Sequence, residues 1–199
     1  NSLKDINTKV FGQFNYYKKN IDILTKKQNQ IMNSKMYEID KIYWLSEDCK
    51  RYGTYSFAGF ARCGFIAIEI LNSFVDEKII TKSDKAKFLA GIQTITSEML
   101  ADKNNLPKKK FLKKYGHLRP DTYEISSKNY RDGYKNYFKS QKKGGKIHKK
   151  NDFLFNKLQK KKIRNFLIHN KFDFNFSEFI NFIKNIIKFR EYSKYVFTK

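Results

Sequence analysis

Apolar residues that recur every three or four positions are the feature that most constrains this fold. Between Ser56 and Val75 they line one face of a helix, because an α-helix turns every ~3.6 residues whereas a strand alternates. The members of this stripe are Phe57, Phe60, Ala61, Gly64, Ile68, Leu71 and Val75. Gly59 and Gly64 carry no side chain. The segment therefore predicts an amphipathic helix whose backbone another helix or a ligand can approach closely.

The same spacing predicts helices through most of the remaining chain. Thr81-x-x-Asp84 should cap one of them and Ser177 should cap the last. The expected helices cover about 3–31, 38–51, 56–75, 82–101, 107–115, 152–169 and 177–199. The predicted fold class is therefore mainly α, an irregular multi-helix domain with a long ordered loop around residues 116–134.

Breaks in these patterns indicate how the chain is organised. Gly53-Thr54 should separate the second helix from the third, and the alternating phenylalanines of 172–176 suffice only for a short extended piece. The basic stretch 139–151 contains paired glycines and is expected to be a mobile surface loop. We expect residues 1–199 to form a single helical domain. Because the chain opens on Asn1 rather than Met, we expect it to be part of something longer.

The net charge of +23 invites a nucleic-acid or anionic-membrane partner. Lysine greatly outnumbers arginine, however, and Asn, Ile, Phe and Tyr are abundant. An AT-rich genome would produce the same mixture without any selection for binding. The charge alone leaves both explanations open.

Cysteine and histidine usage argues against a metal site or a disulfide framework. Cys49 and Cys63 lack the CxxC spacing, and the three histidines lie far apart in the sequence. Two isolated thiols suit a reducing compartment. We find neither a signal peptide nor an apolar run of about 18 residues, the length that a membrane span needs. The expected location is cytoplasmic, without a membrane partner.

The stretch from Phe111 to Tyr130 concentrates side chains that bind or transform ligands. A helix ending at Tyr115-Gly116 would place His117 and Arg119 on an ordered turn, because Pro120 prevents the helix from continuing. The residues of the cluster are His117, Arg119, Asp121, Tyr123 and Glu124. Such a set suits a small anionic or polar ligand. The alternative is an ordinary turn in which the arginine pairs with a neighbouring carboxylate.

Two more arginines occupy notable positions on helices. Arg190 falls within the apolar stripe of the last helix, so it needs a partner, because an uncompensated buried charge is costly. Its partner would be a ligand anion or one of the carboxylates of Glu69, Asp121 and Glu124. Arg62 lies roughly opposite the apolar stripe of its own helix and points either at a cleft or at water.

Several of these segments together resemble phosphoenolpyruvate-synthase-like proteins. The matching segments are 48–54, 57–62, 64–67, 111–130 and 190–199, about half of the chain. The most specific is Gly116-His117-Leu118-Arg119-Pro120 followed by Tyr123 and Glu124. Within that family the chain is most similar to the central domain of small-molecule kinases related to rifampicin phosphotransferase, especially the glutamine kinase of capsule phosphoramidate synthesis.

This resemblance implies an acceptor-binding domain from a three-domain, ATP-dependent kinase. An ATP-grasp domain and a phosphohistidine carrier domain of the same polypeptide would be its partners, and neither is recognisable in this chain. ATP and Mg²⁺ would belong to the missing nucleotide-binding domain, with no cofactor or metal bound here. The best guess for the acceptor is the side-chain amide of L-glutamine, and the chain alone is expected to be inactive. The family usually has Gly and Asp where this chain has Asp121 and Glu124.

The expected roles follow from this resemblance and from the needs of phosphoryl transfer, which are positioning and charge stabilisation. The expected catalytic residues are His117, Arg119 and Glu124. The expected substrate-binding residues are Ser56, Arg62, Asp121, Tyr123 and Arg190. A basic helical nucleic-acid-binding protein is the alternative, and a helical interaction module is a third possibility. Because the nucleic-acid alternative gives no reason for the cluster between Tyr115 and Glu124, we do not expect nucleic acid as the partner.

Overall fold

The computed structural model describes residues 12–120, 124, 126–138, 153–172 and 174–199. Helices form the regular structure of these ranges, which contain no strand, so the prediction of a mainly α fold is confirmed. In chain order the elements are α2 (Phe14–Met32), α3 (Glu38–Asp48), the π-helical segment η1 (Cys49–Thr54), α4 (Tyr55–Asp76), α5 (Lys82–Gly91), α6 (Ile95–Asn105), α7 (Lys108–Tyr115), α8 (Tyr134–Tyr137), α9 (Lys157–His169) and α10 (Phe176–Phe197).

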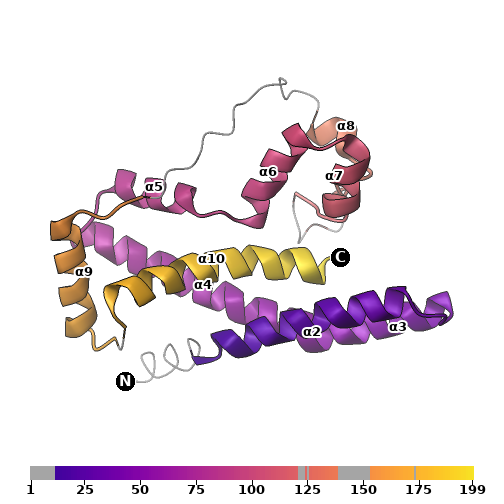
Figure 1. Ribbon diagram of the computed structural model, residues 1–199, viewed down its shortest axis with the longest axis horizontal. Helices are drawn as coiled ribbons and strands as arrows, with labels where there is room; N and C mark the ends of the chain where they lie inside the picture. Colours follow the sequence, from indigo (N-terminus) through magenta and orange to yellow (C-terminus); the bar gives the residue numbers. More distant parts are fainter. Residues whose placement is uncertain (1–11, 121–123, 125, 139–152, 173) are drawn as a thin grey trace.

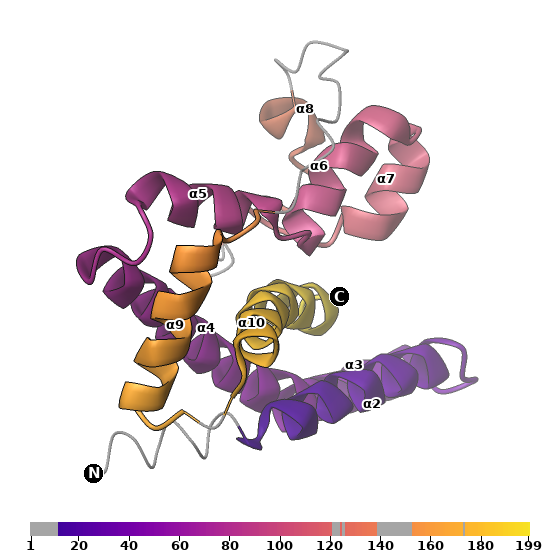
Figure 2. The ribbon, with the colours of Figure 1, turned by 60° about the vertical axis from the view of Figure 1, so that its left-hand side comes forward.

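Helices α4 and α10 form the centre of the molecule. They run side by side in opposite directions in Figures 1 and 2, and α2 packs against both. A Cβ atom on Gly59 would lie 2.4 Å from the ring of Tyr17 in α2, and one on Gly64 would lie 3.0 Å from Cδ of Arg190 in α10. The expectation that small residues of this helix allow close approach is therefore confirmed, and two different helices use it.

Three apolar clusters hold the helices together. The largest joins α4, α5, α9 and α10 and includes Phe74, Phe88 and Ile183, all nearly inaccessible. The second lies between α2, α4 and the end of α10. The third joins α6, α7 and the following segment around Phe111 and Tyr115. This third cluster is the part of the fold that supports the segment rich in ligand-binding side chains.

The expected break at Gly53-Thr54 does not occur. Helix α3 passes through η1 into α4 as one continuous helix, Glu38–Asp76. A π-helix has a wider turn than an α-helix, and this one brings Gly53 against its neighbours. A Cβ atom there would lie 2.9 Å from Cβ of Phe197 and 3.1 Å from Leu24. The glycine thus permits close packing within a helix instead of ending it.

Other helix boundaries also differ from the expectations. The helix expected over 82–101 is two helices, because Thr94 caps a new one at Ile95. The Thr81–Asp84 capping box of α5 is confirmed. The last helix is capped by Asn175, whose side chain accepts from the backbone N–H of Glu178, and not by Ser177. Helix α9 begins at Lys157 rather than near residue 152, within the described part of the chain.

The continuous helix Glu38–Asp76 corrects one statement made from the sequence. It contains a stretch that is long and apolar enough to cross a membrane by length and composition alone. The core helix of a folded domain passes the same test, and α4 buries Phe60, Leu71 and Phe74 against its neighbours. At the other end of this helix, α3 leaves Ile39 and Tyr43 largely exposed.

Candidate functional site

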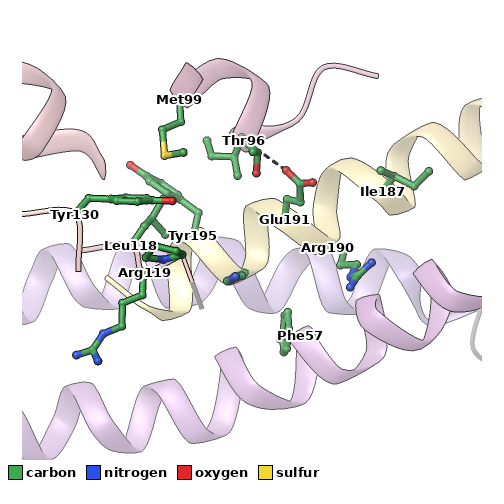
Figure 3. A pocket seen from close by; sticks show the side chains of 13 residues that line it. Phe57, Thr96, Met99, Leu118, Arg119, Tyr130, Ile187, Arg190, Glu191 and Tyr195 are labelled. Carbon is green, nitrogen blue, oxygen red and sulfur yellow. Dashed lines mark hydrogen bonds between the residues drawn. The ribbon is translucent and has the colours of Figure 1, made fainter. Parts of the chain in front are cut away.

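A cavity of about 350 Å³ lies where α4, α6 and α10 meet the segment that follows α7. Figure 3 shows Met99 reaching into it from α6 and Phe57 from α4, on opposite sides. Its apolar wall is formed by Phe57, Ile95, Met99, Leu118, Tyr130 and Tyr195. Its polar lining is formed by Thr96, Arg119, Arg190, Glu191 and Lys194. The cavity thus combines three cations and one carboxylate with aromatic and aliphatic walls.

The segment that carries Arg119 is anchored at its start by Tyr115. This side chain is fully buried, and its hydroxyl donates to Oδ2 of Asp102 over 2.7 Å. Lys114 donates to the same oxygen over 2.7 Å. These two hydrogen bonds lower the pKa of Asp102, whereas burial raises the pKa of Tyr115 to about 12. Tyr115 is therefore a neutral hydrogen-bond donor at ordinary pH and fixes the end of α7.

Backbone hydrogen bonds join residues 116–118 to residues 130–131. The N–H of Arg131 donates to the carbonyl of Gly116 over 3.1 Å, and that of Tyr130 donates to Leu118 over 2.8 Å. The guanidinium of Arg119 donates to the carbonyl of Ser127 over 2.9 Å. The side chain of Arg119 is thus held in place by Ser127 of the same segment.

On the opposite wall, α10 contributes Arg190, Glu191 and Lys194. Glu191 accepts a hydrogen bond from the backbone N–H of Thr96 over 3.2 Å, which ties α10 to the first turn of α6 (Figure 3). Figure 3 shows the guanidinium groups of Arg119 and Arg190 well apart. Two separated cations suit a ligand with more than one polar group, or two ligands.

The expectation that Arg190 is buried is wrong. Its side chain is exposed and lies over the ring of Phe65, 5.4 Å from the centroid. It forms no ion pair with a carboxylate of the described residues: Glu69 accepts from Asn72, and Glu124 accepts from Ser126. Asp121 lies outside the described residues. Because Arg190 is exposed to solvent, it needs no protein carboxylate although it falls within an apolar stripe.

A second hollow of about 490 Å³ adjoins the first and shares Arg119 and Lys194 with it. His117 lines this second hollow. Its Nε2 lies 3.0 Å from the carbonyl oxygen of Tyr195, so the neutral ring donates from Nε2 and leaves Nδ1 as an acceptor. Burial lowers the pKa of His117, and the positive charges of Lys199 and Arg131 add to this effect. His117 is therefore mostly neutral near pH 7 and able to accept a proton.

Three of the remaining expected site residues, Ser56, Arg62 and Glu124, lie in the described part of the chain and do not line either hollow. Ser56 is completely buried, and its hydroxyl has no hydrogen-bond partner among the described residues. Arg62 is exposed on α4, away from both hollows. Glu124 is exposed, and hydrogen bonds from Ser126 lower its pKa, which makes it a turn-forming carboxylate in this structure. Asp121 and Tyr123 lie outside the described residues.

Three lining residues of α10 were not among the expected site residues. Glu191, Lys194 and Tyr195 fall on the same side of the helix as Ile187 and Arg190, at spacings of three and four. They lie in 190–199, one of the segments that carried the family resemblance. Their spacing of one to five residues from Arg190, an expected site residue on the same helix face, was the signal that would have identified them.

No group of three or more His, Cys, Asp or Glu side chains in the described part of the chain could hold a metal ion. Cys49 and Cys63 form no disulfide bond. Comparisons with known protein families, with curated proteins and with solved structures found no match. The chemistry of this site therefore has to be argued from its own side chains.

Proposed function

We propose that this chain binds a small organic molecule with a negatively charged group, and that it is the acceptor-binding domain of an ATP-dependent phosphotransferase. The observation that carries the proposal is the shared cavity: Arg119 and Arg190, far apart in the sequence, line one hollow with apolar walls. Arginine forks bind carboxylate and phosphate oxygens, and the apolar walls accommodate a short carbon chain.

An amino acid amide such as L-glutamine has groups that suit this lining. Its carboxylate would pair with Arg190 or Lys194, and its ammonium would lie near Glu191. Glu191 already accepts from Thr96, but a carboxylate has capacity for several hydrogen bonds. The side chain of the ligand would then extend past Met99 and Tyr195 towards Arg119. The walls of the cavity favour a compact ligand.

In phosphoryl transfer, this domain would position the acceptor and neutralise negative charge. The phosphoryl group would be supplied by the phosphohistidine of a carrier domain, whose P–N bond breaks as the acceptor attacks phosphorus. Arg119 and Lys194, which line both hollows, would stabilise the charge of the transferred group. His117, neutral at working pH, would accept the proton that the acceptor loses. Two cysteines without a disulfide bond suit the expected reducing cytoplasm.

Binding is tested by titrating the chain with L-glutamine and following backbone amide signals by NMR. Arg190→Ala should weaken binding about tenfold or more, because a charge-assisted hydrogen bond is lost. Arg62→Ala is the matched control, since it removes the same exposed charge from α4 outside the cavity. Equal losses in both variants, or no binding by the wild-type chain, would refute the acceptor cavity.

The phosphotransferase part of the proposal is tested separately on the complete reading frame. We expect ATP-grasp and phosphohistidine regions beyond Asn1 and Lys199. The complete polypeptide, given ATP, Mg²⁺ and L-glutamine, should form a phosphorus–nitrogen product visible by ³¹P NMR. A complete protein without those regions would refute the phosphotransferase assignment while leaving ligand binding by the cavity to stand.

A further inference from the structure

We infer that the second hollow is a binding site for a phosphate-type oxyanion, either free phosphate or the phosphate group of a small ester. Its lining brings together His117, Arg119, Arg131, Lys194 and Lys199. If the oxyanion is the phosphoryl group that is transferred to the acceptor, the assignment rests on the proposed function. As a phosphate site it can be tested on the chain alone, and either assignment can fail without the other.

The sign of the charge distinguishes this hollow from others on the described surface. Among the described residues that line it, nine in number, four are Lys or Arg and none is Asp or Glu. Three other hollows each include a carboxylate: Asp76 in one, Glu69 in the next and Asp84 in the third. A chain with a net charge of +23 has cations everywhere. A concave site whose described lining gathers four cationic side chains and no Asp or Glu side chain is more specific than the overall charge.

The hollow is assembled from three segments that are fixed to one another. Residues 116–119 and 129–131 are joined by the hydrogen bond from Arg131 to Gly116, and His117 donates to Tyr195 at the end of α10. The cations are therefore carried by a backbone whose relative placement is already determined. Donors that are already held in place bind an anion without the loss of conformational entropy that ordering the chain would cause.

The end of α10 would ordinarily repel an anion, because helix carboxyl termini carry partial negative charge. Here two of its last carbonyl oxygens are occupied. Tyr195 accepts from His117, and Lys194 accepts from the hydroxyl of Thr198 over 2.8 Å. Donors thus occupy two of the carbonyl groups at this helix end, which weakens their repulsion of an anion.

A dianion with three or more oxygens suits this lining better than a carboxylate does. Several cations approach from different segments, so a tetrahedral group can contact more of them than a planar one. Asn129 adds a further donor, because its side-chain oxygen already accepts from the backbone of Asp132 and leaves its amide nitrogen for a ligand. The hollow meets the first cavity at Arg119 and Lys194, so an organic group attached to the phosphate has a place to extend.

The pKa of His117 is a direct probe of this site. A bound dianion favours the imidazolium, so inorganic phosphate should raise the pKa of His117 by about half a unit or more. Sulfate, which stays a dianion throughout the titration, should do the same. The ring signals of His117 and His169 are followed by NMR against pH at constant ionic strength. His169 lines a hollow that contains Asp76 and Glu77 and serves as the internal reference.

Arg131→Ala should abolish most of the phosphate-dependent shift, because it removes one exposed cation of the hollow. Arg164→Ala is the matched control, since it removes an exposed arginine from α9 and leaves the hollow unchanged. Lys199→Ala is a second variant should Arg131→Ala disturb the loop. Equal shifts of His117 and His169, or an undiminished shift in both hollow variants, would overturn the inference. If Arg131→Ala loses the phosphate-dependent shift of His117 but still binds L-glutamine, the two hollows bind separate ligands.

Discussion

A methyl group at Gly59 would collide with the buried ring of Tyr17, 2.4 Å away. Gly59→Ala should therefore lower the free energy of unfolding by about 1–2 kcal/mol. The steric overlap with Tyr17 destabilises the fold by more than the higher helix propensity of alanine stabilises it. Chemical denaturation measures the change. Gly12→Ala is the control, since nothing lies within 4 Å of a Cβ atom there. Equal stability of the two variants would show that Tyr17 moves aside without cost.

His117 should make stability depend on pH in a defined direction. Its pKa in the folded chain is lowered below the ordinary value of 6.5, mainly by burial. Between these two values the unfolded chain binds more protons, so stability rises as the pH rises through this window and falls as the pH falls. Urea unfolding between about pH 5 and 7 should show this slope in the wild-type chain.

His117→Gln should flatten that slope, because it removes the titrating imidazole. The lowered pKa values of Asp84 and Asp102 contribute in a more acidic range, because carboxyl groups titrate below this window. Parallel pH profiles for the wild-type chain and His117→Gln would show that burial of the imidazole does not control stability here.

At the residue level, part of the candidate site could be predicted from the sequence. Arg119 and Arg190 line the first cavity and His117 lines the adjoining hollow, because a helix end and a proline fix the loop, and an arginine in an apolar stripe marks a groove. For Ser56 and Arg62, the sequence did not show whether the side chain would line a cavity. Periodicity places a residue on a face of a helix, but only tertiary packing determines whether that face meets a cavity, the core or water.

Among the helices, α10 offers a direct comparison of two capping residues. Asn175→Ala should cost about 1 kcal/mol, because its side chain accepts from the N–H of Glu178 and satisfies an otherwise unpaired donor. Ser177→Ala should change stability by less than about 0.5 kcal/mol, because Ser177 is exposed within the first turn. Thermal unfolding of both variants tests this order. A larger loss in Ser177→Ala would reverse the assignment of the cap.

Helix positions were predictable where one stripe of apolar residues dominates, as in α4. They were not predictable where a local signal had two meanings. Gly53 resembled a helix breaker and is a site of close packing inside η1. Thr94 begins a helix within a pattern that appeared continuous from 82 to 101. The role of Gly53 depends on neighbours far away in the sequence, such as Phe197, whereas Thr94 begins a helix through a local capping box with Ser97.

For the whole molecule, the charge of +23 predicts weak binding to nucleic acid without sequence preference. Affinity for duplex DNA should fall by about a thousandfold or more between 50 and 200 mM salt, because such binding is driven by counterion release. Fluorescence anisotropy with two unrelated duplexes measures this dependence. Tight binding at about 150 mM salt with preference for one duplex would instead support the nucleic-acid alternative.

The π-helical segment η1 also sets the phase of the longest helix. A π-turn holds about one more residue than an α-turn, and each residue of an α-helix advances the side chains by about 100° around the axis. Because this wider turn absorbs one extra residue, α3 keeps the phase relative to α4 that an α-helix one residue shorter would give; all six residues of Cys49–Thr54 in α geometry would instead rotate α3 by roughly 100° about the axis. Asp48 would then leave Lys27, whose Nζ is 3.1 Å from its carboxylate, and a different side of α3 would face α2. The π-turn, and not the number of residues alone, therefore selects which face of α3 packs against α2 and which one the protein presents to its surroundings.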